Sequence, residues 1–248
     1  MVETPEIGKD SVAVLLKGGR LPSWHALTAD EQRAFSEEHV ELMLSVAREH
    51  GMMRLEGYKL LSPLQDWARF WVIEFPDLAD AEAWIDAEMA PPYGLYGHFE
   101  YHVSRRWKKD ELDGWVANPL SPIVVPAGTR PVLNTDLSVD EESVIVLLFG
   151  RWLPGAEAET PEERGDREHI ELMQSVAREH EPVRLEAYRL IGPQPNWHHA
   201  WVIEFPDLEG AEAWIEAELR PPHGRFATKT YHLARKWAPE YFATWVPR

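Results

Sequence analysis

Hydrophobic and polar positions follow two kinds of spacing along the first half of the chain. The apolar run at 12–17 is rich in β-branched residues and too short for a helix, so it predicts a strand. From about 29 to 50, apolar residues recur at the 3.6-residue spacing of an amphipathic helix. Three further strands are expected at about 54–61, 68–75 and 98–106, and a second helix at about 78–89, which Pro91-Pro92 would stop.

The same pattern returns about 130 residues later. EHVELMLSVAREH at 38–50 recurs as EHIELMQSVAREH at 168–180, and WVIEFPDL at 71–78 recurs at 201–208. The first strands, SVAVLL at 11–16 and SVIVLL at 143–148, are offset by 132, so the loop after them differs by two residues. Because such agreement in register cannot arise by chance, the chain is an internal tandem duplication.

Each copy therefore reads as β-α-β-β-α-β, the order of a split βαβ, ferredoxin-like unit. We expect a first repeat at 1–116, a proline-rich linker at 117–142 and a second repeat at 143–248. A sheet with helices on one face leaves its other face bare, and the sister copy is the obvious cover. The predicted fold is α+β, with two ferredoxin-like repeats forming an intramolecular dimeric α/β barrel.

Charge and composition limit the classes of molecule that the protein is expected to bind. The formal net charge of −17 repels phosphate backbones and anionic lipids, so we expect no nucleic-acid partner and no membrane partner. The absence of cysteine excludes disulfides and thiolate chemistry. No secretory signal or apolar run long enough to span a membrane is found, so a cytoplasmic protein is expected.

Three motifs stand out: the helix segment EHVELM at 38–43, the strand and turn VIEFPDL at 72–78 with the AEAW helix start, and an acidic residue before PPYG at 91–94. With these motifs each copy resembles the YCII-related family of the dimeric α/β-barrel superfamily. The opening strand and the Leu-Pro-Ser-Trp loop are somewhat similar to darcynin-type proteins. The resemblance implies an acid–base dyad of a histidine and an aspartate. It places the dyad on His39 and Glu88, and on His169 and Glu218 in the second copy. This chain departs from the family in having glutamate, and in the two residues inserted before the proline.

The residues themselves allow the same chemistry. His39 shares a helical face with Met43 and Val46, and imidazole suits proton transfer when a carboxylate orients it. The alternative is an ordinary core histidine. Glu88 lies on the apolar side of its helix, where partial desolvation would raise its pKa, or else it reaches solvent from the last turn.

The strands offer a set of polar residues whose side chains alternate with apolar ones. If these faces turn inward they form a substrate pocket; the alternative is cross-strand ion pairing that joins two sheets. The predicted substrate-binding residues are Arg54, Tyr58, Trp71, His102, Arg184, Tyr188, Trp201 and His232.

Metal and cofactor signals are weak. His198-His199 and His223 occur only in the second copy, and no known ligand spacing supports a metal site. We expect no metal and no cofactor. Haem with a histidine ligand is kept as an alternative by analogy with other tandem barrels.

The leading hypothesis is a cofactor-independent lyase, isomerase or cyclase that acts on a small aromatic or unsaturated acid. A non-catalytic small-molecule binding or assembly protein and a haem-binding or oxygen-using monooxygenase are the alternatives. The copies differ at positions such as Tyr93/His223 and Ala90/Arg220, so one site alone could be active. The sequence leaves open the substrate, the active copy, and whether the internal pseudo-dimer assembles into a homo-oligomer.

Overall fold

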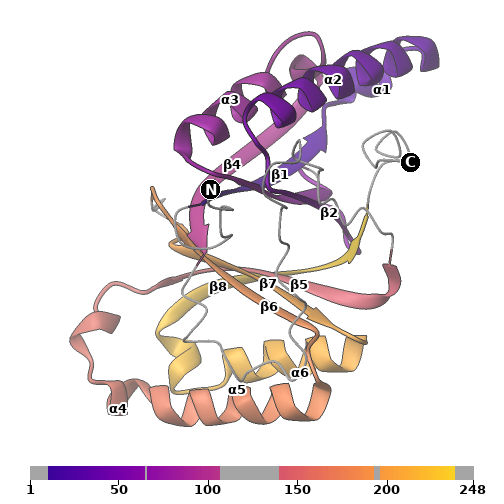
Figure 1. Ribbon diagram of the computed structural model, residues 1–248. Helices are drawn as coiled ribbons and strands as arrows, with labels where there is room; N and C mark the ends of the chain where they lie inside the picture. The colour runs from indigo at the N-terminus through magenta and orange to yellow at the C-terminus, as the bar shows by residue number, and fades with distance from the viewer. Residues whose placement is uncertain (1–10, 65, 107–139, 193–195, 238–248) are drawn as a thin grey trace, which may run out of the picture. The chain divides into compact units, whose positions relative to one another are not determined.

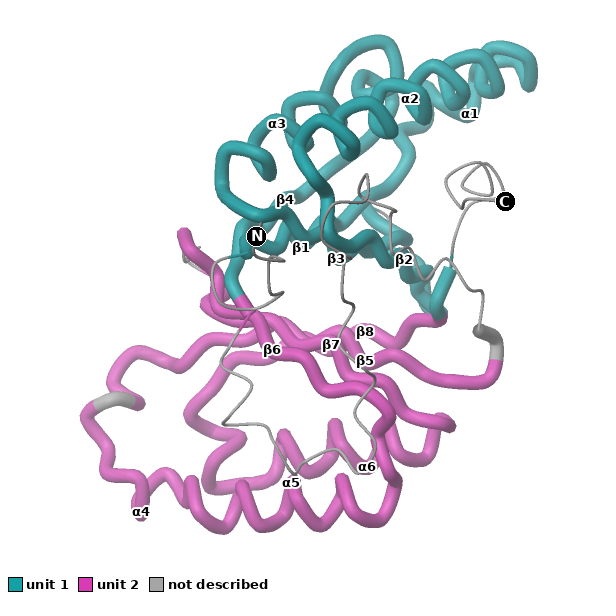
Figure 2. The backbone as a smooth tube through the Cα atoms, in the orientation of Figure 1, with its two compact units in different colours: residues 1–105, 122–139, 236–248 teal, residues 106–121, 140–235 magenta. Residues whose placement is uncertain are grey.

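The computed structural model describes residues 11–64, 66–106, 140–192 and 196–237, and these fall into two compact units (Figure 2). Unit 1 holds the described residues up to 105 together with 236–237, and unit 2 holds 106 and 140–235. Trp237, expected in the second repeat, thus belongs to unit 1. The predicted linker at 117–142 lies almost wholly outside the described residues.

Unit 1 has the predicted β-α-β-β-α-β order, with one short helix added after the first strand and a 3₁₀ turn before the last. Its elements are β1 (Val12–Arg20), α1 (Pro22–His25), α2 (Ala29–Glu49), β2 (Arg54–Leu60), β3 (Arg69–Phe75), α3 (Leu78–Glu88), η1 (Tyr93–Tyr96) and β4 (Gly97–Arg106).

The sheet of unit 1 has the strand order β2-β3-β1-β4, and each strand is antiparallel to its neighbours. Leu15 marks the register, since it pairs with Val72 on one side and His102 on the other. Helices α2 and α3 cover one face of this sheet (Figure 1). Alternate residues of β1, among them Val14 and Leu16, pack against those helices to form the core.

Unit 2 repeats this arrangement with the sheet order β6-β7-β5-β8. The β5–β7 and β6–β7 pairs are antiparallel, in the register of their counterparts in unit 1. Its elements are β5 (Asp140–Trp152), η3 (Ala156–Ala158), α4 (Pro161–Arg164), α5 (Asp166–His180), β6 (Arg184–Leu190), β7 (His199–Phe205), α6 (Leu208–Leu219), η4 (His223–Arg225) and β8 (Ala227–Lys236).

The first long helix differs between the units. In unit 1, α2 is continuous for 21 residues and begins at a capping box formed by Thr28 and Glu31. In unit 2, Gly165 adopts a left-handed conformation with φ 67° and divides the equivalent segment into α4 and α5. A Cβ at Gly165 would also lie 2.5 Å from the Pro222 ring. The break therefore needs glycine on two grounds.

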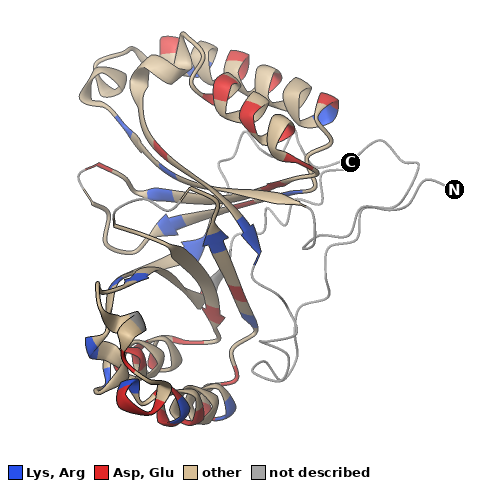
Figure 3. Cartoon of the chain, turned by 90° about the vertical axis from the view of Figure 1, so that its left-hand side faces the viewer, with Lys and Arg blue, Asp and Glu red and all other residues tan. Residues whose placement is uncertain are grey.

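Acidic side chains gather on the helices, and Lys and Arg are frequent on the strands (Figure 3). The negative charge therefore sits on the exposed helical faces, while cations lie nearer the sheets. Among the described helices, none is long and apolar enough to cross a membrane.

Candidate functional site

The predicted dyad of unit 1 comes together in the structure. His39 lies on the buried side of α2 beside Val40, and Glu88 is the last residue of α3. The Nε2 atom of His39 lies 2.8 Å from Oε2 of Glu88, and their side chains are only 8% and 13% exposed. A short, shielded contact of this kind allows a carboxylate to orient an imidazole.

The segment after α3 fixes the plane of the His39 ring. It contains a cis Pro91-Pro92 bond and then Tyr93, whose ring stacks on His39 with centroids 3.8 Å apart and planes 9° apart. The next residue, Gly94, donates a backbone hydrogen bond to the carbonyl of Ala90. Imidazole orientation is therefore set by a carboxylate at one nitrogen and an aromatic ring on one face.

His39 and Glu88 line a cavity of about 50 Å³ in unit 1. Two guanidinium groups lie in its wall: Arg20 stacks 4.0 Å over Tyr93, and Arg69 stacks 4.5 Å over Trp237. The remaining wall is mostly apolar and aromatic. It is formed by Leu16, Gly18, Gly19, Val40, Met43, Leu55, Trp71, Ile73, Trp84, Tyr93 and Phe99.

Tyr101 on β4 adds a polar atom to the same neighbourhood. Its hydroxyl oxygen is buried and has no hydrogen-bond partner among the described residues. Burial, and then the negative charge of Glu88, raise the pKa of Tyr101 far above its ordinary value of 10. This hydroxyl therefore stays protonated and keeps a hydrogen that it can donate.

The equivalent hydrogen bond does not form in unit 2. His169 Nε2 lies 3.7 Å from Oε2 of Glu218, beyond hydrogen-bond range, and the Lys229 ammonium donates to that same oxygen instead. The ring of His223, in the place of Tyr93, stacks on His169 at 3.7 Å. Burial, followed by the charges of His223 and Lys229, lowers the pKa of His169 to about 3.

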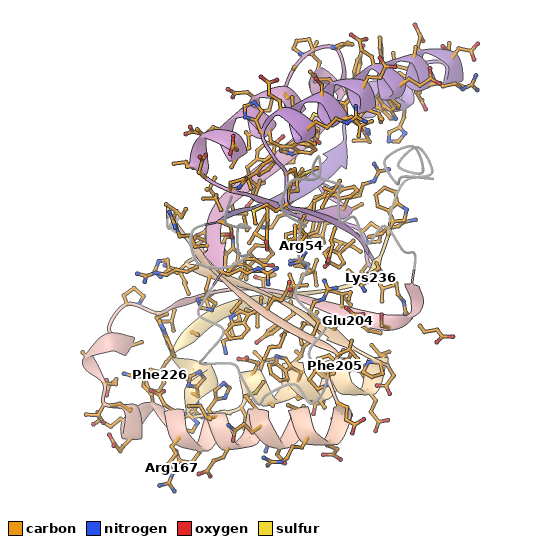
Figure 4. All side chains as sticks on the ribbon, in the orientation of Figure 1. Arg54, Arg167, Glu204, Phe205, Phe226 and Lys236 are labelled. Atoms are coloured by element: carbon orange, nitrogen blue, oxygen red, sulfur yellow. The ribbon has the colours of Figure 1, made fainter. Side chains whose placement is uncertain are left out.

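The predicted substrate-binding residues divide between the two faces of the sheet. Trp71 lines the cavity as expected. Arg54 and Tyr58 do not, because they alternate with Leu55 and so lie on the face away from the helices; Figure 4 labels Arg54. There both donate to Glu56, Arg54 at 2.7 Å and Tyr58 at 2.6 Å.

The other predicted strand residues also form ion pairs and hydrogen bonds within their sheets. His102 lies 2.7 Å from Glu100, and this hydrogen bond is the main cause that lowers the pKa of Glu100 to about 2. The pattern extends to unit 2. Arg184 contacts Glu204 at 3.4 Å, Tyr188 donates to Glu186 at 2.9 Å, Trp201 packs on the core, and His232 alternates with the core residue Tyr231. Of these contacts, the Arg184–Glu204 pair joins neighbouring strands, whereas the His102–Glu100 and Tyr188–Glu186 contacts lie within one strand.

Three residues of the cavity, Arg20, Arg69 and Phe99, were missed by the sequence interpretation, although a signal existed. Arg20 and Arg69 end β1 and begin β3, and at the repeat offsets their counterparts are Trp152 and His199. Likewise Phe99 corresponds to Lys229. A comparison of the two copies for changes of charge, rather than for identities, would have marked all three positions.

The histidines specific to the second copy do not assemble a metal site. His223 Nδ1 lies 3.2 Å from Asp166. Among the described residues, no group of three or more His, Asp or Glu side chains could hold a metal ion.

Comparison with known proteins links the fold to one class of enzyme. No family model and no curated protein sequence matches the chain. Similar solved structures include chlorite dismutase from Candidatus Nitrospira defluvii in complex with imidazole, which is 12% identical with a TM-score of 0.67 over 95% of both chains. A mutant of that enzyme is 15% identical, with a TM-score of 0.65 over 98% of this chain and 97% of the other. The chlorite dismutase-like protein TA0507 is 11% identical, with a TM-score of 0.63 over 92% and 95%.

The chain therefore shares the dimeric α/β-barrel, ferredoxin-like fold of the chlorite dismutases. At these identities the likeness shows the fold alone. Membership of the YCII-related family is not shown.

The expectation of no cofactor is contradicted by these neighbours, because chlorite dismutases are haem-dependent enzymes. They favour the haem-related alternative over a cofactor-independent reaction. The described residues around His39 do not fit haem, however. His39 already directs Nε2 at Glu88, and a cavity of about 50 Å³ is far below the roughly 300–1,000 Å³ of ordinary ligand pockets. We therefore assign no haem ligand.

Proposed function

We propose that unit 1 carries an acid–base site for a small organic anion and that the chain is a small-molecule enzyme of the lyase, isomerase or cyclase type. The observation that carries the proposal is the 2.8 Å contact between the shielded side chains of His39 and Glu88 at a cavity wall. Proton transfer at a carbon beside a carboxylate or carbonyl is the chemistry that such a pair supports.

The roles follow from the contact. When Glu88 accepts the proton on Nε2 of His39, the other ring nitrogen, Nδ1, is left as the basic one. His39 is therefore the proposed proton carrier, and Glu88 orients it and stabilises the imidazolium that forms. Tyr101, held neutral, is a hydrogen-bond donor near Glu88.

The walls of the cavity suggest the substrate. Arg20 and Arg69 provide positive charge for a carboxylate, and Trp71, Trp84 and Phe99 provide aromatic surface. Because the cavity is small, it would hold the reacting end of the molecule rather than the whole of it. An aromatic or unsaturated carboxylic acid meets both conditions.

The test uses a panel of small aromatic and unsaturated carboxylates, followed by NMR for binding and for exchange of carbon-bound hydrogen with D₂O. His39→Gln is expected to abolish exchange and leave the fold intact by circular dichroism. His169→Gln is the matched control and is expected to keep full activity. Undiminished exchange in His39→Gln would contradict the proposal.

We further propose that the chain consists of two tandem ferredoxin-like repeats whose sheets close into one intramolecular barrel. The βαββαβ order within each unit and the similarity to chlorite dismutases over 95% of the chain support this. It also explains why the helix-free sheet face is rich in buried ion pairs such as Arg54–Glu56.

Haem binding is a second candidate function, favoured by the structural neighbours and not by any residue identified above. Titration of the purified protein with haemin, followed by visible absorption, tests it. A Soret band that saturates at a fixed haem-to-chain ratio would support haem binding. A spectrum identical to free haemin would end it.

A further inference from the structure

The two copies keep the same histidine and glutamate but surround them differently. Every cavity residue with a charge or a large ring was compared at the repeat offsets. Four positions change in character: Arg20 becomes Trp152, Arg69 becomes His199, Phe99 becomes Lys229, and Tyr93 becomes His223. Unit 2 thus has neither guanidinium group at the positions that would receive an anion in unit 1.

The third change acts directly on the dyad. Phe99 in unit 1 is an apolar wall and leaves Glu88 to His39. At the same place in unit 2, Lys229 brings an ammonium group into contact with Oε2 of Glu218. The carboxylate is then engaged by a cation whose side chain is only 7% exposed.

His169 is left in an environment that opposes its protonation. The groups that face it are Glu218 from α6, Lys229 from β8, His223 from η4 and Asp166 from its own helix. Burial, then His223 and Lys229, disfavour the imidazolium, and Asp166 favours it. The direction of this effect agrees with the 3.7 Å gap to Glu218.

We infer that the two copies have divided their roles: the proton-transfer site survives only in unit 1, and Lys229 is the residue that dismantles it in unit 2. The inference rests on the proposed function for what the intact site does. The uncoupling of His169 from Glu218 stands on the geometry alone.

The test exchanges Phe99 and Lys229 and detects the hydrogen bond between histidine and glutamate in each unit. Imidazole N–H protons are followed by NMR in protein labelled with ¹⁵N at histidine, and the His39 signal is assigned by its loss in His39→Gln. Lys229→Phe is expected to produce a new, slowly exchanging Nε2–H signal at His169. Phe99→Lys is expected to remove the signal of His39 and any exchange activity with it.

Two variants keep the experiment decisive. Arg167→Met removes an exposed cation that points outward from α5 (Figure 4) and is expected to leave every signal unchanged. Lys229→Met removes the charge with a flexible apolar chain, in case Lys229→Phe fails to fold.

The outcomes separate the two claims. No new His169 signal in either folded Lys229 variant would overturn the inference. If the signals change as expected while His39→Gln leaves carbon–hydrogen exchange intact, the uncoupling stands and the proposed function fails. If Lys229→Phe also gains activity at His169, both are supported.

Discussion

Arg54 shows how strongly a single buried charge depends on its neighbours. Its side chain is 1% exposed and contacts Glu56 at 2.7 Å and Glu74 at 3.4 Å. Such a group is stabilised only while its partners are present, because each charge has lost its water.

Removing the cation should therefore be costly. Arg54→Met leaves two buried carboxylates without this partner, and we expect it to lower the free energy of unfolding by about 3–5 kcal/mol. Lys59→Met, at an exposed position of the same strand, should change it by less than about 0.5 kcal/mol. Urea unfolding of both variants measures the difference, and similar values for the two would show that the Arg54 cluster contributes little.

At this scale the resemblance to the YCII-related family suggested His39 and Glu88 as a pair, and helical spacing placed each of them on the apolar side of its helix. The sequence did not separate Trp71, which lines the cavity, from Arg54 and Tyr58, which do not. Alternation along a strand says that neighbouring residues face opposite ways, but not which face carries the helices. The role of Lys229 could not be predicted from the sequence either, since it depends on the contact between its ammonium group and Glu218 in the folded protein.

Among the elements, the turn from α3 into η1 places a strong steric demand on one residue near the site. A Cβ on Gly94 would lie 2.3 Å from the carbonyl oxygen of Met89, and Gly224 shows the same approach to Leu219 in unit 2. Backbone cannot yield as a flexible side chain does, so this turn needs glycine.

Gly94→Ala is accordingly expected to destabilise the protein by about 1–3 kcal/mol. It should also displace Tyr93 from its stack on His39 and weaken carboxylate binding at the site. Gly192→Ala is the control, because nothing lies within 4 Å of a Cβ there. Thermal unfolding and a binding titration on both variants give the comparison; an unaltered Gly94→Ala variant would refute the steric argument.

Most elements were predictable because periodicity and proline breaks are local signals. Strands and helices of unit 1 begin and end within a few residues of their expected positions. The division of the unit 2 helix at Gly165 was not predicted. A glycine in a helical pattern is often tolerated, so the pattern alone does not predict the left-handed φ of 67° that Gly165 adopts.

For the whole molecule, the protonation of buried histidine links stability to pH. His169 has its pKa lowered to about 3, mainly by burial, against an ordinary value of 6.5. The unfolded chain therefore binds a proton below pH 6.5 that the folded chain refuses until about pH 3. Stability should fall as the pH drops through this window and be unaffected by His169 above it.

His169→Gln should flatten that dependence. Between pH 7 and pH 5 we expect the wild-type protein to lose about 1 kcal/mol more than the variant, after discounting for solvent screening. Glu100 does not interfere, because its pKa of about 2 makes its contribution disappear only below pH 4.5. Urea unfolding at the two pH values provides the measurement, and equal losses would contradict the assignment.

The α+β fold class could be predicted from the sequence because the order of strands and helices follows from local patterns of apolar and polar residues. The expectation of no cofactor was wrong because the similarity to haem enzymes lies at 11–15% identity. At that level the folds are alike although few residues are identical. No local motif in this chain could have carried that information.

Each dyad and its stacking ring come from a single unit: His39, Glu88 and Tyr93 from one, and His169, Glu218 and His223 from the other. A substitution at the dyad of one unit therefore leaves the dyad of the other unit unchanged, so the two sites can diverge in sequence independently. A ligand of the His39 site should accordingly bind at one site per polypeptide. Isothermal titration calorimetry should give a hyperbolic binding curve with a stoichiometry near one.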